Sequence, residues 1–391
     1  FVNPGGIPRL SYLNTDAASA QNVAIDANLF QFSTNAPGFG GASASANDNV
    51  TLTVTDRLYF SNASVPVFGS FTAVAGNSIF REPGGGFTDV WLDAIGAVSL
   101  TATNGAIGTA ADLARFGTTG SLTLSGGTNV YFNVGANPIN DATLAGISSG
   151  AATGTIALKN TGANDITLGG THTRDDLLEL TAGQNIVFSP SARMTTAGYK
   201  FNSPTQINAG AQLVQTAGTS TANAMLTHAG TFRINGGSLN MPGGYTDAGG
   251  TLHLGGGAIT GPAAGLTLAS GRLTGTGTFT GNVINNAGVV APGNSPGLLT
   301  IAGDYTQGAT GQLNMEIEGA TPGAGYDRLA ITGNATLNGT IQVTTPGAFV
   351  PATTDVFDFV NYVNQAYGGQ LCDRCNALSG TPIGVTAGAT T

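Results

Sequence analysis

The chain has 391 residues, of which 41% are hydrophobic and only 8% are charged, and its formal net charge is −9. Soluble domains usually carry about a quarter of their residues as Asp, Glu, Lys and Arg, so helices with charged outer faces are not expected. The acidic balance argues against a nucleic-acid-binding protein, because phosphate contacts need clustered Lys and Arg, and it also disfavours binding to an anionic membrane surface. No apolar run reaches the 18 or more residues of a membrane span, so we expect no membrane insertion within this chain.

Residues 1–48 form the first segment, which we expect to be irregular or to act as an N-terminal cap. It contains a passage rich in Gly, Ala and Ser between Pro37 and Ala46. The chain begins with Phe1 and shows no signal peptide, so we expect either a removed targeting segment or an excerpt of a longer protein.

A repeated strand pattern begins at Asn49. Val50, Leu52 and Val54 alternate with threonines, and this period of two predicts a strand with one buried face. Pairs of apolar residues with one residue between them recur between Gly and Asn corners, at Leu58/Phe60, Val98/Leu100, Leu122/Leu124, Val130/Phe132, Ile156/Leu158, Ile166/Leu168, Leu178/Leu180, Ile186/Phe188, Phe232/Ile234, Leu252/Leu254, Leu266/Leu268, Leu313/Met315/Ile317, Leu329/Ile331 and Ile341/Val343. A lone strand of this size cannot bury its apolar face, so stacked turns of roughly 20–25 residues must form a common core. The pattern predicts an all-β solenoid over residues 49–345.

Residues 346–391 break this pattern. Val356, Phe357, Phe359, Val360 and Tyr362 read as one aromatic strand, which we expect to cap the last turn or to form an assembly segment against a second copy of the chain. Cys372 and Cys375 follow as a Cys-x-x-Cys pair. A zinc site needs a second pair and a thioredoxin-type site needs a βαβ context, so a disulfide, within the chain or between chains, is the favoured interpretation.

The densest ionisable group in the sequence is His172, Arg174, Asp175, Asp176 and Glu179. A carbohydrate lyase or hydrolase would need carboxylates and a cation on one face, but these residues crowd one turn, where neighbours point apart. We therefore interpret the group as a solvated loop.

The other candidates also have a structural interpretation. Asp304, Glu316, Glu318 and Asp327 are expected on a solvent face, with Met315 and Ile317 inward. His172, His228 and His253 lack metal-ligand spacing, and no phosphate loop or Gly-x-Ser-x-Gly elbow is present. A sugar-stacking strip of Phe87, Trp91, Tyr131 and Phe132 is less favoured than core packing. We expect no catalytic residue, no cofactor and no metal site.

The stretch Gly288–Gln307 combines a short apolar run, the corner Pro292-Gly293-Asn294-Ser295-Pro296-Gly297 and the strand residues Leu299 and Ile301. With Thr276–Val283 and Tyr326–Leu329, it resembles the C-terminal passenger segment of bacterial autotransporters and secreted proteins of the filamentous-haemagglutinin type. The phrase Ser99–Thr109 resembles turns of the latter. The resemblance implies an extracellular, right-handed parallel β-helix.

The function expected from these observations is that of a secreted, non-enzymatic structural or adhesive protein of the bacterial surface. It would act as a stiff rod for adhesion to host or surface glycans or proteins, or associate with itself into an extracellular filament. The alternative is a carbohydrate-active β-helix enzyme, because this fold also carries polysaccharide lyases and fold is a poor guide to function.

Overall fold

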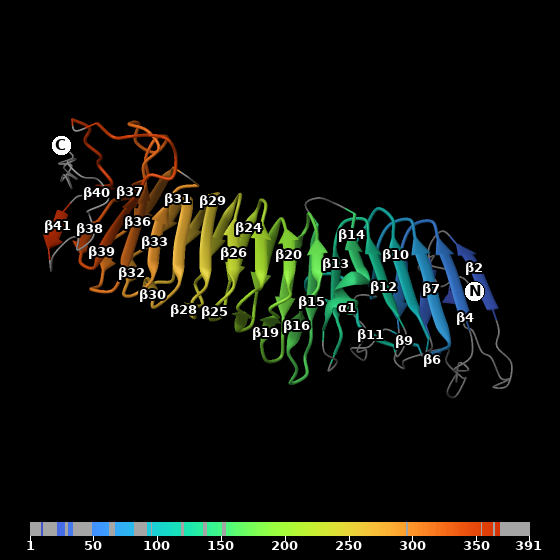
Figure 1. Ribbon diagram of the computed structural model, residues 1–391. Coiled ribbons are helices and arrows are strands. Elements are labelled where there is room, and N and C mark those ends of the chain that lie inside the picture. Colours follow the sequence, from blue (N-terminus) through green and yellow to red (C-terminus); the bar gives the residue numbers. More distant parts are fainter. Residues whose placement is uncertain are drawn as a thin grey trace. The chain divides into compact units, whose positions relative to one another are not determined.

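The computed structural model (Figure 1) describes residues 9–10, 22–27, 30–33, 49–61, 67–81, 92–94, 96–118, 121–135, 139–150, 154–294, 296–352, 354–362 and 364–367. The described chain forms a parallel β-solenoid, as the sequence predicts, and it divides into two compact units. Unit 1 comprises residues 1–167 and 175–184, and unit 2 comprises residues 168–174 and 185–391. The first division falls within β16 (Ile166–Leu168).

Unit 1 is built from parallel ladders in which each strand pairs with the strand one turn later. The longest ladder contains β2 (Asn22–Ala27), β4 (Asn49–Val54), β7 (Ser70–Ala75), β10 (Val98–Ala102), β12 (Leu122–Gly126) and β14 (Ile147–Ser149). The others contain β1 (Arg9–Leu10), β3 (Phe30–Ser33), β5 (Leu58–Ser61) and β8 (Ile79–Arg81); β6 (Val67–Phe68), β9 (Leu92–Ala94) and β11 (Phe116–Thr118); and β13 (Val130–Asn133), β15 (Thr155–Lys159) and β18 (Leu177–Thr181). Parallel pairing thus extends upstream of Asn49, since β2 pairs with β4 in register.

Helix is confined to one short segment among the described residues, α1 (Asp141–Ala145) in unit 1. The Asn140 side chain accepts a hydrogen bond from the Thr143 backbone N–H, and the Thr143 hydroxyl accepts one from the Asn140 backbone N–H. This capping box holds a single turn that the sequence pattern did not predict.

Each turn of unit 2 contributes one strand to each of three faces. The first face contains β17 (Thr171–Thr173), β20 (Arg193–Thr196), β23 (Gln212–Gln215), β26 (Thr231–Ile234), the first halves of β29 (Thr251–Thr260) and β31 (Arg272–Thr280), β33 (Val289–Pro292), β36 (Gln312–Glu316) and β39 (Thr340–Thr344). The second contains β21 (Gly198–Phe201), β24 (Thr219–Ala222), β27 (Ser238–Asn240), the second halves of β29 and β31, β34 (Leu298–Ala302), β37 (Arg328–Ile331) and β40 (Val360–Asn361).

The third face of unit 2 is made of two five-stranded sheets. Within the unit they contain β19 (Ile186–Phe188), β22 (Thr205–Ile207), β25 (Leu226–His228) and β28 (Tyr245–Asp247), and then β30 (Leu266–Leu268), β32 (Val283–Asn285), β35 (Tyr305–Gln307), β38 (Asn334–Leu337) and β41 (Asn364–Tyr367). Successive strands of each face lie side by side in Figure 1.

The core follows from the alternation of side chains along each strand, because the same inward position is apolar in turn after turn. On the first face of unit 2 one buried row is Leu213, Phe232, Leu252, Leu273, Val290, Leu313 and Ile341. In unit 1 the corresponding row is Leu52, Ala73, Leu100, Leu124 and Ile147. Full burial of each large aliphatic side chain contributes about 1.5–3 kcal/mol, so stacking supplies the stability that a single turn lacks.

The expected aromatic strand of Val356, Phe357, Phe359, Val360 and Tyr362 is a strand only in part. Only Val360–Asn361 pairs with β37 as a strand, the Phe359 carbonyl accepts a hydrogen bond from the Leu329 backbone N–H, and ring contacts hold Phe357 and Phe359. The Tyr326 ring packs edge-on against Phe357 at 5.2 Å and against Phe359 at 5.9 Å between ring centroids. These ring contacts hold the part of the segment that precedes the short ladder with β37.

Candidate functional site

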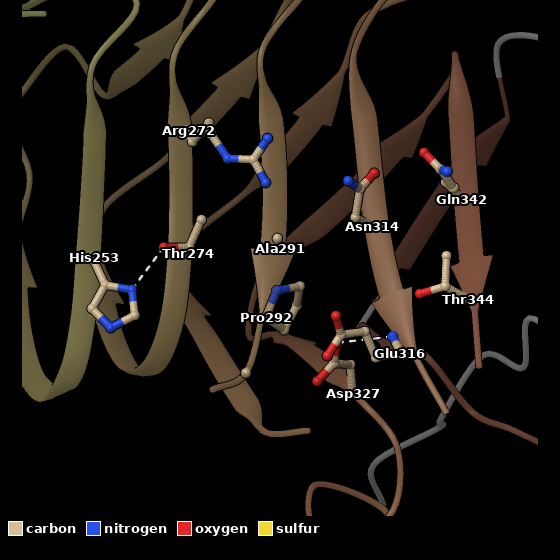
Figure 2. Close-up of a pocket in the computed structure, with 11 residues that line it drawn as sticks. His253, Arg272, Thr274, Ala291, Pro292, Asn314, Glu316, Asp327, Gln342 and Thr344 are labelled. Atoms are coloured by element: carbon tan, nitrogen blue, oxygen red, sulfur yellow. Dashed lines mark hydrogen bonds between the residues drawn. The ribbon is translucent and has the colours of Figure 1, made fainter. Parts of the chain in front are cut away.

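A polar groove lies on the outer surface of the first face of unit 2, where β29, β31, β33, β36 and β39 run side by side (Figure 2). The cavity has a volume of about 380 Å³ and is lined by His253, Arg272, Thr274, Ala291, Pro292, Gly293, Asn314, Glu316, Asp327, Gln342 and Thr344. The lining residues span 92 positions of sequence but only five neighbouring strands of one face and the adjoining corner.

The groove exists because one outward row contains a residue too small to fill it. The row runs from His253 through Thr274 to Ala291, and Asn314 and Gln342 continue it on the next two strands. The methyl side chain of Ala291 leaves a hollow between Thr274 and Asn314, and β33 then leaves the face at Pro292. Figure 2 shows Arg272 extending from β31 towards β33, above Ala291.

Loop insertions border the groove at the corner between the first and second faces. One residue separates β20 from β21, but five separate β33 from β34, eleven separate β36 from β37 and fifteen separate β39 from β40. In solenoid proteins, insertions of this kind collect on one side and often mark the binding face. We name them the first (293–297), second (317–327) and third (345–359) corner loops.

Asp327 fastens the first corner loop to the second. Its Oδ1 accepts a hydrogen bond from the Gly297 backbone N–H at 2.8 Å, and its Oδ2 accepts one from the Glu316 backbone N–H at 2.9 Å. Burial raises the pKa of Asp327 to about 6, even though both backbone N–H groups stabilise the carboxylate. The sequence pattern placed Asp327 on a solvent face, which is wrong. Only 1% of the residue is exposed, because its carboxylate lies between the two backbone N–H groups that it accepts from.

Gly293 is required beside this carboxylate. Its φ is +96°, and a Cβ at this position would lie 2.2 Å from Asp327 Oδ1 and 2.6 Å from the Gly297 backbone nitrogen. The Pro-Gly corner of the sequence is therefore shaped around the Asp327 side chain.

The third corner loop packs on the second through Tyr326. Besides its ring contacts with Phe357 and Phe359, its hydroxyl accepts a hydrogen bond from the Asp358 backbone N–H at 3.4 Å. Phe357, Phe359, Val360 and Tyr362 are buried within the chain, whereas Val356 is exposed. Four of the five side chains of the expected assembly segment are thus engaged in intramolecular packing.

The charged groups of the groove lie at opposite ends. The side chains of Arg272 and Glu316 have no hydrogen-bond or ion-pair partner within the described part of the chain, and two strand spacings, about 10 Å, separate their strands. Neither charge neutralises the other, because an ion pair needs the two groups within about 4 Å. Asn314 adds a free hydrogen-bond acceptor, since its Oδ1 is buried without a partner among the residues that the structure describes.

His253 belongs to a hydrogen-bonded row on the upstream wall of the groove. Its Nε2 lies 3.1 Å from Arg233 Nη2 and its Nδ1 lies 2.9 Å from Thr274 Oγ1. Because a guanidinium can only donate, Nε2 accepts and Nδ1–H donates to the Thr274 hydroxyl. Desolvation and the Arg233 charge both lower the pKa of His253, which favours this neutral tautomer.

The other residues singled out from the sequence have structural surroundings. Glu316 and Glu318 point outward, with Met315 and Ile317 buried, as predicted. Asp304 accepts hydrogen bonds from the Asn334 backbone and side-chain amides. Phe132 is a core residue that stacks on Phe116.

The His172–Glu179 group is divided between the two units. His172 lies half-buried on β17 in unit 2, whereas Asp176 and Glu179 belong to unit 1. The Asp176 side chain is buried, and its carboxylate accepts a hydrogen bond from the Ser149 hydroxyl, so it has a structural role and is not part of a solvated loop. Phe87, Trp91, Cys372 and Cys375 lie outside the described residues.

Sequence reasoning missed the groove itself, because its residues come from five different turns. No group of three or more His, Cys, Asp or Glu side chains suited to a metal ion occurs in the ranges that the structure describes. Across the same ranges, no helix has the length and apolar character needed to cross a membrane. No protein-family model, no curated protein and no solved structure matches this chain.

Proposed function

We propose that this chain is an extracellular, non-enzymatic β-helix protein of the bacterial surface that works by adhesion. The observation that carries the proposal is the groove on the first face of unit 2, bordered by three successive corner loops. A solenoid fixes side chains at the strand spacing, so such a groove is a rigid binding surface that needs no reorganisation. The sparse charge and the resemblance of Gly288–Gln307 to secreted passenger proteins support the location.

The buried carboxylate supports binding over catalysis. Each carboxylate oxygen of Asp327 accepts a hydrogen bond from a backbone N–H group. The carboxylate therefore holds the corner loops together and is not directed at a ligand. If Asp327 does not act as an acid or base, Glu316 has no second carboxylate in the groove to work with. A glycoside hydrolase needs a pair.

Adhesion by a single chain is favoured over assembly through the C-terminal segment. Phe357, Phe359, Val360 and Tyr362 are already buried, so a contact with a second copy would first have to remove them from their own corner loops. Exposure of four such side chains costs several kcal/mol in total at about 25 cal/mol per Å² of apolar surface.

A second candidate, a carbohydrate-active enzyme, has one observation in its favour. Glu316 and Asp327 line the same groove, and the pKa of Asp327 is raised to about 6. A carboxyl with a raised pKa is suited to general acid catalysis, and Glu316 supplies the second carboxyl group.

One experiment separates the two candidates. The purified chain is incubated with immobilised bacterial and host polysaccharides and surface proteins, and both retention and product release are measured. Retention without new reducing ends or unsaturated uronates is the expected result. Product that disappears in Glu316→Gln would establish the enzyme instead, and a chain that neither binds nor cleaves any of these surfaces would overturn the proposal.

A further inference from the structure

The groove has features that select one class of ligand. It lies on the face of a sheet, where strands such as β31, β33 and β36 already pair with both neighbours. An extended peptide that binds by strand addition needs a free edge, which this face does not offer. The ligand must therefore be recognised by side chains alone, through hydroxyls, amides and charges.

The lining side chains match a polyhydroxylated ligand. Asn314 and Gln342 carry amides, Thr274 and Thr344 carry hydroxyls, and Glu316 carries a carboxylate that accepts only. Ala291 and Pro292 form a small apolar floor between these groups, on which the C–H face of a sugar ring can pack. An apolar floor surrounded by a few convergent polar side chains is typical of ligand-binding sites.

The upstream side of the groove adds positive charge. The Arg272 side chain is exposed and has no partner in the described ranges, and Arg233 lies on the same face two strands earlier, also exposed. The distance between their strands is about 10 Å. A guanidinium binds a carboxylate through two parallel hydrogen bonds, which a neutral sugar cannot provide.

We propose that this groove binds an acidic oligosaccharide, with a uronic acid carboxylate on Arg272 and sugar hydroxyls on Asn314, Glu316 and Gln342. The chain of sugars crosses the strands at a right angle, so that an acidic unit further upstream reaches Arg233. This inference rests on the proposed adhesive function and names the class of glycan at the site.

The test uses the full chain and two probes of equal length, a hexamer of galacturonic acid and a neutral hexamer of glucose, in isothermal titration calorimetry at low salt. We expect binding of the acidic hexamer and at least tenfold weaker binding of the neutral one. Arg272→Gln should weaken binding of the acidic hexamer by about tenfold or more, because a charge-assisted bidentate contact is lost. Ala291→Leu should abolish it by filling the floor.

Two matched variants serve as controls. Arg57→Gln removes the same charge from an exposed site in unit 1, and Val187→Leu enlarges an outward side chain on β19, on the third face of unit 2 and away from the groove. Both should bind like the unmodified chain, and circular dichroism should show the same fold for all four variants.

Equal affinity for the two hexamers would overturn the inference, and so would Arg272→Gln and Ala291→Leu variants that bind as tightly as their controls. A chain that adheres to surfaces but binds neither hexamer would refute this inference and leave the adhesive function standing. A chain that adheres to nothing would refute the adhesive function itself.

Discussion

Acid should destabilise unit 2 through His228, which is fully buried on β25. Its Nδ1 lies 3.0 Å from the Tyr245 hydroxyl, and its Nε2 is buried with no hydrogen-bond partner in the described chain. The Gly250 backbone closes over the ring, since a Cβ there would lie 2.6 Å from Nδ1. An imidazolium would need acceptors for two N–H groups and finds none at Nε2.

The sign and size of the effect follow from the pKa. Burial lowers the pKa of His228 to about 4, although the nearby Asp247 carboxylate raises it. The unfolded chain has a His pKa of about 6.5, so it binds the proton first as the pH falls. Above about pH 6.5, His228 therefore does not lower the free energy of unfolding. Between pH 6.5 and 4, the free energy of unfolding declines as the pH falls. Two pH units, from 6.5 to 4.5, correspond to about 3 kcal/mol at 1.36 kcal/mol per unit.

The assay compares the unmodified chain with His228→Phe in thermal unfolding followed by circular dichroism at pH 7 and pH 4.5, at one scan rate. A change of about 3 kcal/mol corresponds to roughly 6–12 °C for a unit of this size. The Tm of the unmodified chain should fall by about that much more than the Tm of the variant. His253→Gln is the control, because His253 is only part-buried and should leave most of the acid sensitivity in place. Parallel losses of Tm in the unmodified chain and His228→Phe would refute the reasoning.

Three further substitutions probe the corner loops and the buried amides. Asp327→Ala should destabilise by about 1–3 kcal/mol, because two backbone N–H groups lose their acceptor, and amide hydrogen exchange at Gly297 and Glu316 should accelerate; unchanged exchange would contradict this. Gly293→Ala should lower the Tm, because a Cβ would collide with Asp327 Oδ1, whereas Gly323→Ala, whose Cβ would make only an ordinary contact with Leu298, should be affected only by its positive φ; equal losses would contradict the steric argument. Gln307→Leu should cost about 1–3 kcal/mol in chemical denaturation, because its Nε2 donates to the carbonyls of Asn338 and Thr340 one turn away, and a neutral result would exclude a stabilising role for the amide.

The sequence predicted strands only from pairs of inward apolar residues. Leu252/Leu254 and Leu266/Leu268 both lie on strands with these side chains buried. The pattern missed β23 and β24, where Gln215 and Ser220 point inward. Gln215 donates from Nε2 to backbone carbonyls of its own turn and the next, so a buried amide replaces an aliphatic residue there. A search for hydrophobic periodicity does not detect such a strand.

The sequence by itself determined the kind of fold, because apolar residues at a period of two between Gly corners can be buried only by stacking turns. Only the tertiary structure decided which turns align. From Arg272 the register advances by 17 residues to Val289, then by 23 to Gln312 and by 28 to Thr340, because the corner loops differ in length. These unequal steps decide which residues line the groove. Ala291 forms its floor only because the register places Thr274 and Asn314 on the neighbouring strands beside it. Backbone hydrogen bonds between turns set that register, and no local pattern in the chain encodes it.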